Sequence, residues 1–173
     1  MINNQIFRIA IVGPESTGKT TLAQDLAKHL QTSWVPEFAR QFLEDLGRDY
    51  EKTDLVTIAR GQLATEDEKL RDASGYLICD TNLVVIKIWS EYKYGDLDQW
   101  IQDQLMERSY DLYLLTDCDI PWEYDSQREN PYDRKILFER YRDFLKECEV
   151  PFHVLRGSRE ERLSTALQII SDL

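Results

Sequence analysis

The sequence predicts an α/β fold in which helices cover both faces of a parallel sheet. A glycine-rich loop at residues 13–20 separates an apolar, β-branched run from a helical pattern. Short apolar runs then alternate with helical spacings to the end of the chain, the order typical of a parallel sheet. Glu37, Asp80 and Asp117 lie at or just beyond predicted strand ends. Ligands of such sheets bind beyond the carboxyl ends of the strands, so this edge is the predicted site.

The loop Gly13–Thr20, GPESTGKT, fits the phosphate-loop pattern G-x-x-x-x-G-K-[ST] at every fixed position. Its glycines permit backbone angles that let N–H groups turn toward anionic oxygens at a helix N-terminus. We expect Lys19 to reach the β- and γ-phosphates of ATP and the Thr20 hydroxyl to ligate Mg²⁺. The predicted ATP-binding residues are Gly13, Glu15, Ser16, Thr17, Gly18, Lys19, Thr20 and Thr21.

The motif and the alternating elements predict a P-loop NTPase or kinase, a three-layer sandwich with helices on both faces of the sheet. The predicted strands are residues 6–12, 33–35, 75–80, 110–117 and 152–155. The predicted helices are residues 21–30, 37–46, 54–70, about 83 onward, 100–108, 135–146 and 158 onward. Asp54 and Ser158 are expected to cap their helices, and Gly47 to end one.

Length and composition fit one soluble domain over residues 1–173. No apolar run approaches the ~20 residues of a membrane helix, and no leader pattern opens the chain, so we expect a cytoplasmic protein. The net charge of −11 argues against a general grip on nucleic acid. We therefore expect a small-molecule partner, with neither nucleic acid nor membrane involved, and the oligomeric state stays open.

Two acidic positions have chemistry suited to phosphoryl transfer. Asp80 follows four apolar residues at a strand end, where a carboxylate can hold Mg²⁺ directly or through water. Glu37 follows the second predicted strand, where kinases of small molecules place the acceptor, and it can accept a hydroxyl proton. Arg40 lies one helical turn beyond Glu37 and can pair with it.

The segment of residues 118–134 is polar and aperiodic, and we predict that it forms a lid. Arg128 and Arg134 are expected to close over the transferring phosphate and neutralise its developing charge. Trp122, in the same segment, can stack on a heteroaromatic ring, as can Trp34, Trp89 and Tyr92 elsewhere.

Four stretches together resemble the ribosylnicotinamide kinase domain of NadR-type proteins, a branch of P-loop kinases for which a match to an AAA-type ATPase family is also expected. They are the phosphate loop, VPEFAR at residues 35–40, CDTN at residues 79–82, and residues 121–134. The resemblance implies a five-stranded parallel sheet with a mobile lid. It also implies transfer of phosphate from ATP to the 5′-hydroxyl of nicotinamide riboside, giving nicotinamide mononucleotide for NAD biosynthesis.

By position, the resemblance assigns ATP and Mg²⁺ to Lys19 and Thr20, and Mg²⁺ or the acceptor hydroxyl to Asp80. Glu37 and Arg40 would face the acceptor, and Arg128 and Arg134 would belong to the lid. Asn82 and Trp122 complete the predicted substrate contacts. The general base is left open between Glu37 and Asp80.

The chain departs from some members at Pro36 and Asn82, where they have an aromatic residue and a second acid. NadR proteins usually carry an adenylyltransferase domain ahead of the kinase, and that activity is not expected here. Alternatives are another nucleoside or nucleotide kinase, or a regulatory ATPase acting through a partner. The second is disfavoured because threonine follows Asp80 where such machines place a glutamate, and no guanine-reading N-K-x-D motif occurs.

Overall fold

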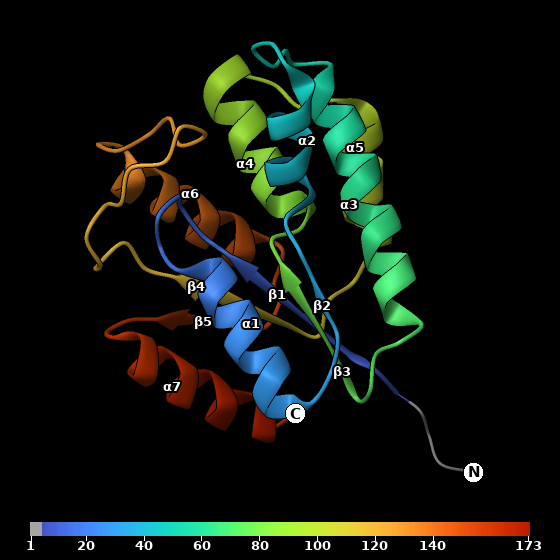
Figure 1. The fold of residues 1–173 in the computed structure, drawn as a ribbon, viewed down its shortest axis with the longest axis vertical. Helices are drawn as coiled ribbons and strands as arrows, with labels where there is room; N and C mark the ends of the chain where they lie inside the picture. Colours follow the sequence, from blue (N-terminus) through green and yellow to red (C-terminus); the bar gives the residue numbers. More distant parts are fainter. Residues whose placement is uncertain (1–4) are drawn as a thin grey trace.

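A computed structural model describes residues 5–173 as a parallel sheet with helices on both faces (Figure 1). The strands are β1 (Phe7–Val12), β2 (Trp34–Val35), β3 (Tyr76–Asp80), β4 (Leu112–Thr116) and β5 (Phe152–Leu155). The helices are α1 (Lys19–Leu30), α2 (Phe38–Leu46), α3 (Asp54–Leu70), α4 (Leu83–Tyr94), α5 (Gln99–Glu107), α6 (Arg134–Glu147) and α7 (Arg159–Ser171). The strand order β2-β3-β1-β4-β5 makes β1 the central strand.

Strand β1 is buried on both sides, which explains its nearly continuous apolar sequence. Ile9 and Ile11 pack with residues of α1 and α7. Ala10 and Val12 point the other way and pack with residues of α4 and α6. This alternation follows from the two-residue period of a strand, and it builds two core layers with the sheet between them.

Helices α2, α3, α4 and α5 gather at one end of the sheet (Figure 1). Their shared core joins Ala39, Leu55, Ile58, Ile86 and Ile101. This cluster holds the start of α2 and one face of α4 against the carboxyl edge of the sheet, so both helices can contribute side chains to that edge.

The predicted fold class is confirmed, including the five parallel strands and the helix that follows Asp80. Ser158 caps α7, with its hydroxyl accepting from the Glu161 N–H, and Gly47 ends α2 at φ 67°. The predicted Asp54 cap is wrong: Asp54 is the first residue of α3, and its carboxylate accepts from the Glu51 N–H and from Arg48. Within residues 5–173, no helix is both long enough and apolar enough to span a bilayer.

Candidate active site

The phosphate loop connects β1 to α1 and passes very close to the end of β4. Gly13 has a φ of 142°, and a Cβ placed there would lie 2.5 Å from the Thr116 hydroxyl oxygen. Only glycine fits both this angle and this approach. The Thr17 hydroxyl donates to the Pro14 carbonyl at 2.7 Å and lies 2.7 Å from Thr116 Oγ1. The loop is therefore held in shape by its own polar groups and by β4.

Arg162 of α7 supports the loop from the other side, and sequence reasoning missed it. Its buried guanidinium donates to the Thr17 carbonyl at 2.5 Å, to the Asp117 carbonyl at 3.0 Å and to Asp119. Its Nε–H donates to the Gly157 carbonyl at 3.0 Å. One side chain thus joins the phosphate loop to the segments that follow β4 and β5. An arginine in the first turn of the last helix has no sequence signal that marks this role.

Lys19, Thr20 and Asp80 meet where the loop passes into α1. The Thr20 hydroxyl donates to Asp80 Oδ2 at 2.6 Å, and Lys19 Nζ donates to the Pro14 carbonyl at 2.8 Å. Burial and the nearby Glu37 charge raise the pKa of Asp80 to about 6, against the Thr20 hydrogen bond and the Lys19 charge. Burial lowers the pKa of Lys19, opposed by the charges of Glu37 and Asp80.

The oxygens of Thr20 and Asp80 fit a Mg²⁺ ion. Asp80 Oδ1 is buried and has no hydrogen-bond partner within residues 5–173, which leaves one oxygen free for a ligand. In the same part of the chain, no three His, Cys, Asp or Glu side chains form a complete metal site. A bound Mg²⁺ would therefore share its coordination among these oxygens, nucleotide phosphates and water, as this ion usually does.

Glu37 is placed at the N-terminus of α2 by contacts with α3. The Phe38 N–H donates to Gln62 Oε1 at 2.9 Å. The Phe38 ring lies against Gly61, where a Cβ would be only 2.2 Å from the ring, so glycine is needed for this packing. Gln62 itself is buried, and no side chain within residues 5–173 hydrogen-bonds the Glu37 carboxylate. The backbone around Glu37 is thus fixed by α3, and the Glu37 carboxylate is left to interact with a ligand.

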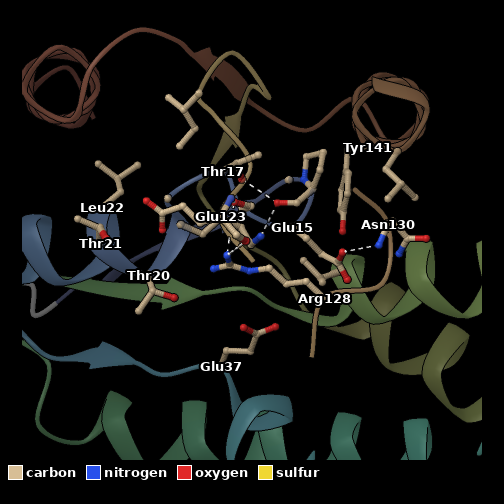
Figure 2. Close-up of a pocket in the computed structure, with 18 of the residues that line it drawn as sticks. Glu15, Thr17, Thr20, Thr21, Leu22, Glu37, Glu123, Arg128, Asn130 and Tyr141 are labelled. Carbon is tan, nitrogen blue, oxygen red and sulfur yellow. Dashed lines mark hydrogen bonds between the residues drawn. The ribbon is translucent and has the colours of Figure 1, made fainter. Parts of the chain in front are cut away.

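One cavity of about 460 Å³ joins the phosphate loop to the helical cluster. Figure 2 shows Arg128 and Glu37 approaching it from opposite sides. Its lining includes all of residues 13–21 of the phosphate loop, and from helices α2, α4 and α6 it includes Arg40, Val85, Ile88, Trp89, Tyr92 and Tyr141. The cavity therefore has a polar, amide-rich end and a largely aromatic and aliphatic end.

The covering loop, residues 118–133, contains no helix or strand and lies across the phosphate loop. The Glu123 N–H donates to the Ser16 hydroxyl at 2.8 Å. The N–H groups of Glu129 and Asn130 donate to the Glu15 carboxylate at 3.1 and 3.0 Å. Glu15, predicted as a phosphate contact, therefore holds the covering loop in this structure.

The predicted lid residues separate into two groups. Arg128 lines the cavity, and its guanidinium lies 2.5 Å from the Glu123 carbonyl and 3.4 Å from the Ser16 hydroxyl. Arg134 begins α6 and donates to the Ser16 and Ile120 carbonyls at 3.1 and 3.0 Å, without lining the cavity. Trp122 packs 5.7 Å from the Arg134 guanidinium and is also outside the cavity lining. The structure thus brings Arg128, but neither Arg134 nor Trp122, to the cavity.

Two other predicted contacts need correction. Arg40 lines the cavity but pairs with Asp125 of the covering loop at 2.9 Å, not with Glu37. Asn82 is fully buried, and its side chain accepts from the Val84 N–H at 3.0 Å as the cap of α4. A strand end followed at once by a helix needs such a cap, and that need accounts for Asn82 without a substrate.

Of the aromatic residues considered for stacking, Trp89 and Tyr92 of α4 line the cavity. Trp34 lies elsewhere, beside Ser33, Pro36 and Lys69. Tyr141 was not predicted and contributes a buried ring from α6. Helical spacing marks such residues as apolar, but it does not show which of them face a cavity.

The phosphate loop, the parallel sheet and the cavity at its carboxyl edge define the P-loop kinase fold. The chain belongs to the AAA domain family (AAA_28), whose model matches residues 8–162.

The comparisons also confirm the resemblance to NadR-type proteins. The chain is 27% identical, over 172 residues, to the trifunctional NAD biosynthesis/regulator protein NadR of Salmonella typhimurium. That match covers 95% of this chain but only 42% of the relative. A crystal structure of NadR protein in complex with NR aligns with a TM-score of 0.85 at 19% identity, covering 96% of this chain and 51% of the other. The structure of deoxyadenosine kinase from M. mycoides with bound dCTP aligns with a TM-score of 0.59 at 16% identity. That alignment covers 96% of this chain and 100% of the other.

Proposed function

We propose that this chain transfers the γ-phosphoryl group of ATP to a nucleoside hydroxyl, and that its acceptor is the 5′-hydroxyl of nicotinamide riboside. The main support is that one cavity is lined by the phosphate loop, by Glu37 and by the aromatic residues Trp89 and Tyr92. Such a cavity can hold a phosphate donor and an aromatic acceptor together, with a carboxylate between them. In-line phosphoryl transfer depends mainly on that positioning.

On the donor side, the loop amides and Lys19 bind the polyphosphate. Lys19 is partly buried, and its charge interacts with Glu37, Asp80 and Glu15, so a bound polyphosphate would join an existing charge network. Thr20 and Asp80 would hold Mg²⁺, which neutralises charge on the phosphate oxygens when bound. Arg128 faces the same space and would stabilise charge as the phosphoryl group moves.

On the acceptor side, Glu37 is the better candidate for the general base. Its carboxylate lines the cavity. Asp80 has one oxygen held by Thr20 and lies outside the cavity lining, as expected of a residue that serves the metal site. Glu37 would accept the proton of the acceptor hydroxyl as its oxygen attacks the phosphorus.

The aromatic end of the cavity suits the acceptor's base. The indole of Trp89 offers an electron-rich face, which attracts a positively charged ring such as the pyridinium of nicotinamide riboside. Tyr92 lines the same cavity, with the Arg140 guanidinium 5.1 Å from the centroid of its ring. The NadR structure holds NR, and the Salmonella relative is a NAD biosynthesis/regulator protein, and both support the same acceptor. The likeness to deoxyadenosine kinase makes a purine nucleoside the alternative.

A substrate panel tests this proposal. The protein is incubated with Mg·ATP and, separately, nicotinamide riboside, deoxyadenosine, adenosine and thymidine, and products are identified by mass spectrometry. We expect nicotinamide mononucleotide to form at least ~10-fold faster than any other product, and Glu37→Gln to slow it without weakening ATP binding. Equal or faster phosphorylation of deoxyadenosine would overturn the acceptor assignment. ADP release without any phosphorylated nucleoside would overturn the kinase assignment.

A further inference from the structure

Glu129 of the covering loop hydrogen-bonds both the phosphate loop and the side of the helical cluster. Its backbone N–H donates to the Glu15 carboxylate of the phosphate loop at 3.1 Å. Its own carboxylate accepts from the Tyr50 hydroxyl at 2.6 Å and from Lys93 Nζ at 3.0 Å, on the side of the helical cluster. A single residue therefore links the phosphate loop to the opposite wall.

The Tyr50 hydroxyl continues this link to the acceptor end. It donates to Glu129 Oε2 and accepts from the Trp89 indole N–H at 2.8 Å and from Lys93 Nζ at 2.5 Å. One donor and two acceptors are all that a phenol hydroxyl offers, so its hydrogen-bonding capacity is fully used. The Tyr50 and Trp89 rings also meet edge to face, with centroids 4.8 Å apart.

Neither Tyr50 nor Glu129 lines the cavity, but their neighbours do. Trp89, held by Tyr50, lies at the aromatic end, and Arg128 and Asn130 flank Glu129 at the phosphate end. Tyr50 and Glu129 are thus placed to act through other residues, as positioning residues. The Glu129–Lys93 ion pair is largely exposed, and such pairs contribute little alone. The shared Tyr50 hydroxyl is therefore the element on which the link depends.

We propose that the chain of contacts Glu15–Glu129–Tyr50–Trp89 makes nucleotide binding and acceptor binding mutually favourable. A nucleotide that orders the phosphate loop and covering loop fixes Glu129, which fixes Tyr50 and the indole against which the acceptor base packs. By linkage, the acceptor strengthens nucleotide binding by the same factor. This inference rests on the proposed function, because it assumes that the acceptor occupies the aromatic end.

Calorimetry tests the coupling on the intact chain. The Kd of nicotinamide riboside is measured without and with saturating Mg·AMP-PNP, for the wild type, Tyr50→Phe and the control Tyr94→Phe. Tyr94 also lies on this cluster, and its hydroxyl makes no hydrogen bond within residues 5–173. We expect AMP-PNP to tighten acceptor binding at least ~10-fold in the wild type and the control, and less than ~3-fold in Tyr50→Phe. Unchanged coupling in Tyr50→Phe, or none in the wild type, overturns the proposal. If Tyr50 had a merely structural role, Tyr50→Phe would weaken nicotinamide riboside binding equally without and with AMP-PNP. The ratio of the two Kd values would then stay as in the wild type.

A second measurement does not need the acceptor, so it separates this inference from the proposed function. The chain contains four tryptophans, which can be labelled with 5-fluorotryptophan, and Trp89→Phe assigns the Trp89 signal in ¹⁹F NMR. We expect Mg·AMP-PNP to shift that signal in the wild type and in Tyr94→Phe, and at least ~3-fold less in Tyr50→Phe. An equal shift in Tyr50→Phe would mean that the contact chain does not transmit the effect. Failure of nicotinamide riboside to bind, with the ¹⁹F result as expected, would overturn only the choice of acceptor.

Discussion

The Thr20 hydroxyl donates a 2.6 Å hydrogen bond to Asp80, although the two residues are 60 positions apart in the sequence. Thr20 lies in the first turn of α1, which follows β1 and the phosphate loop, and Asp80 ends β3, the strand that pairs with β1. The register that pairs Ile11 with Asp80 brings them together beneath the phosphate loop. Thr20 thus holds one oxygen of the Asp80 carboxylate, Oδ2, and leaves Oδ1 for a metal ion.

We predict that Asp80→Asn raises the stability of the protein at pH 8 and lowers its activity. The pKa of Asp80 is raised from 3.8 to about 6, so the folded protein binds this proton more tightly than the unfolded chain does. Its contribution to stability is full at low pH and is lost as pH rises through 6. Asparagine mimics the protonated form, so at pH 8 it should stabilise the metal-free protein by up to about 3 kcal/mol.

The same substitution should lower kcat by at least ~100-fold, because the predicted metal site loses its carboxylate. Denaturant unfolding at pH 5 and pH 8, beside a steady-state kinase assay, checks both halves. A variant that is less stable than the wild type at pH 8, or that retains near-normal turnover, would contradict this account of Asp80.

Glu66 should produce a second pH dependence that is unrelated to activity. It is buried in α3, accepts from the Tyr110 hydroxyl at 2.8 Å and lies 3.6 Å from Arg108. Burial raises its pKa to about 7, so stability from this group is greatest below pH 4.5 and falls as pH rises through 7. Glu66→Gln should flatten the loss of unfolding free energy between pH 5 and pH 8 and leave kcat within about twofold. An undiminished slope would show that another group dominates.

Arg128→Ala should lower kcat more than it raises the KM for ATP. Arg128 lines the cavity from the covering loop, and its charge matters most when phosphate charge is redistributing. We expect a loss of roughly 100-fold or more in kcat. Arg134→Ala is the comparison. Because Arg134 donates hydrogen bonds to two backbone carbonyls, this substitution should also lower the thermal stability of the protein. A change confined to KM in Arg128→Ala would mean that this arginine only holds bound ligand.

Gly13→Ala should disable the phosphate loop, and Gly95→Ala is the comparison. Gly13 and Gly95 both have positive φ, but only at Gly13 does a Cβ meet other atoms, at 2.5 Å from Thr116 Oγ1. Gly95→Ala should cost about 1 kcal/mol of unfolding free energy and preserve ATP binding. Gly13→Ala should cost more and weaken ATP binding at least ~10-fold. Equal effects of the two substitutions would contradict a special need for glycine at position 13, where φ is 142° and β4 lies close, compared with φ 79° at Gly95.

Much of the fold could be predicted because local patterns determine it. The phosphate loop has a defined sequence motif. It is preceded by the apolar run of a buried strand and followed by the spacing of an amphipathic helix. The prediction of α4 from Leu83 rested on the turn expected after Asp80, and the structure supplies that turn with Asn82 as its cap. The same residue shows the limit, because a capping amide and a substrate-binding amide look alike in sequence.

The covering loop could not be predicted in detail because its contacts with Glu15, Ser16 and Arg40 join residues more than 80 positions apart. Arg128 and Arg134 lie in the same polar segment, and the sequence does not distinguish their roles. Only the structure shows that Arg128 lines the cavity and that Arg134 donates to the Ser16 carbonyl. Tyr50 and Arg162 had no motif at all. Their roles arise from hydrogen bonds to partners that only the tertiary fold brings near.

The most direct test of the central claim follows the γ-phosphoryl group itself. The protein is given Mg·ATP labelled with ¹⁸O in the γ-phosphoryl group, together with nicotinamide riboside, and the products are analysed by mass spectrometry. We predict that the label appears in nicotinamide mononucleotide in step with ADP, and that Lys19→Ala nearly abolishes its formation. Label found only in inorganic phosphate, at the same rate with and without the nucleoside, would contradict transfer to an acceptor in the cavity.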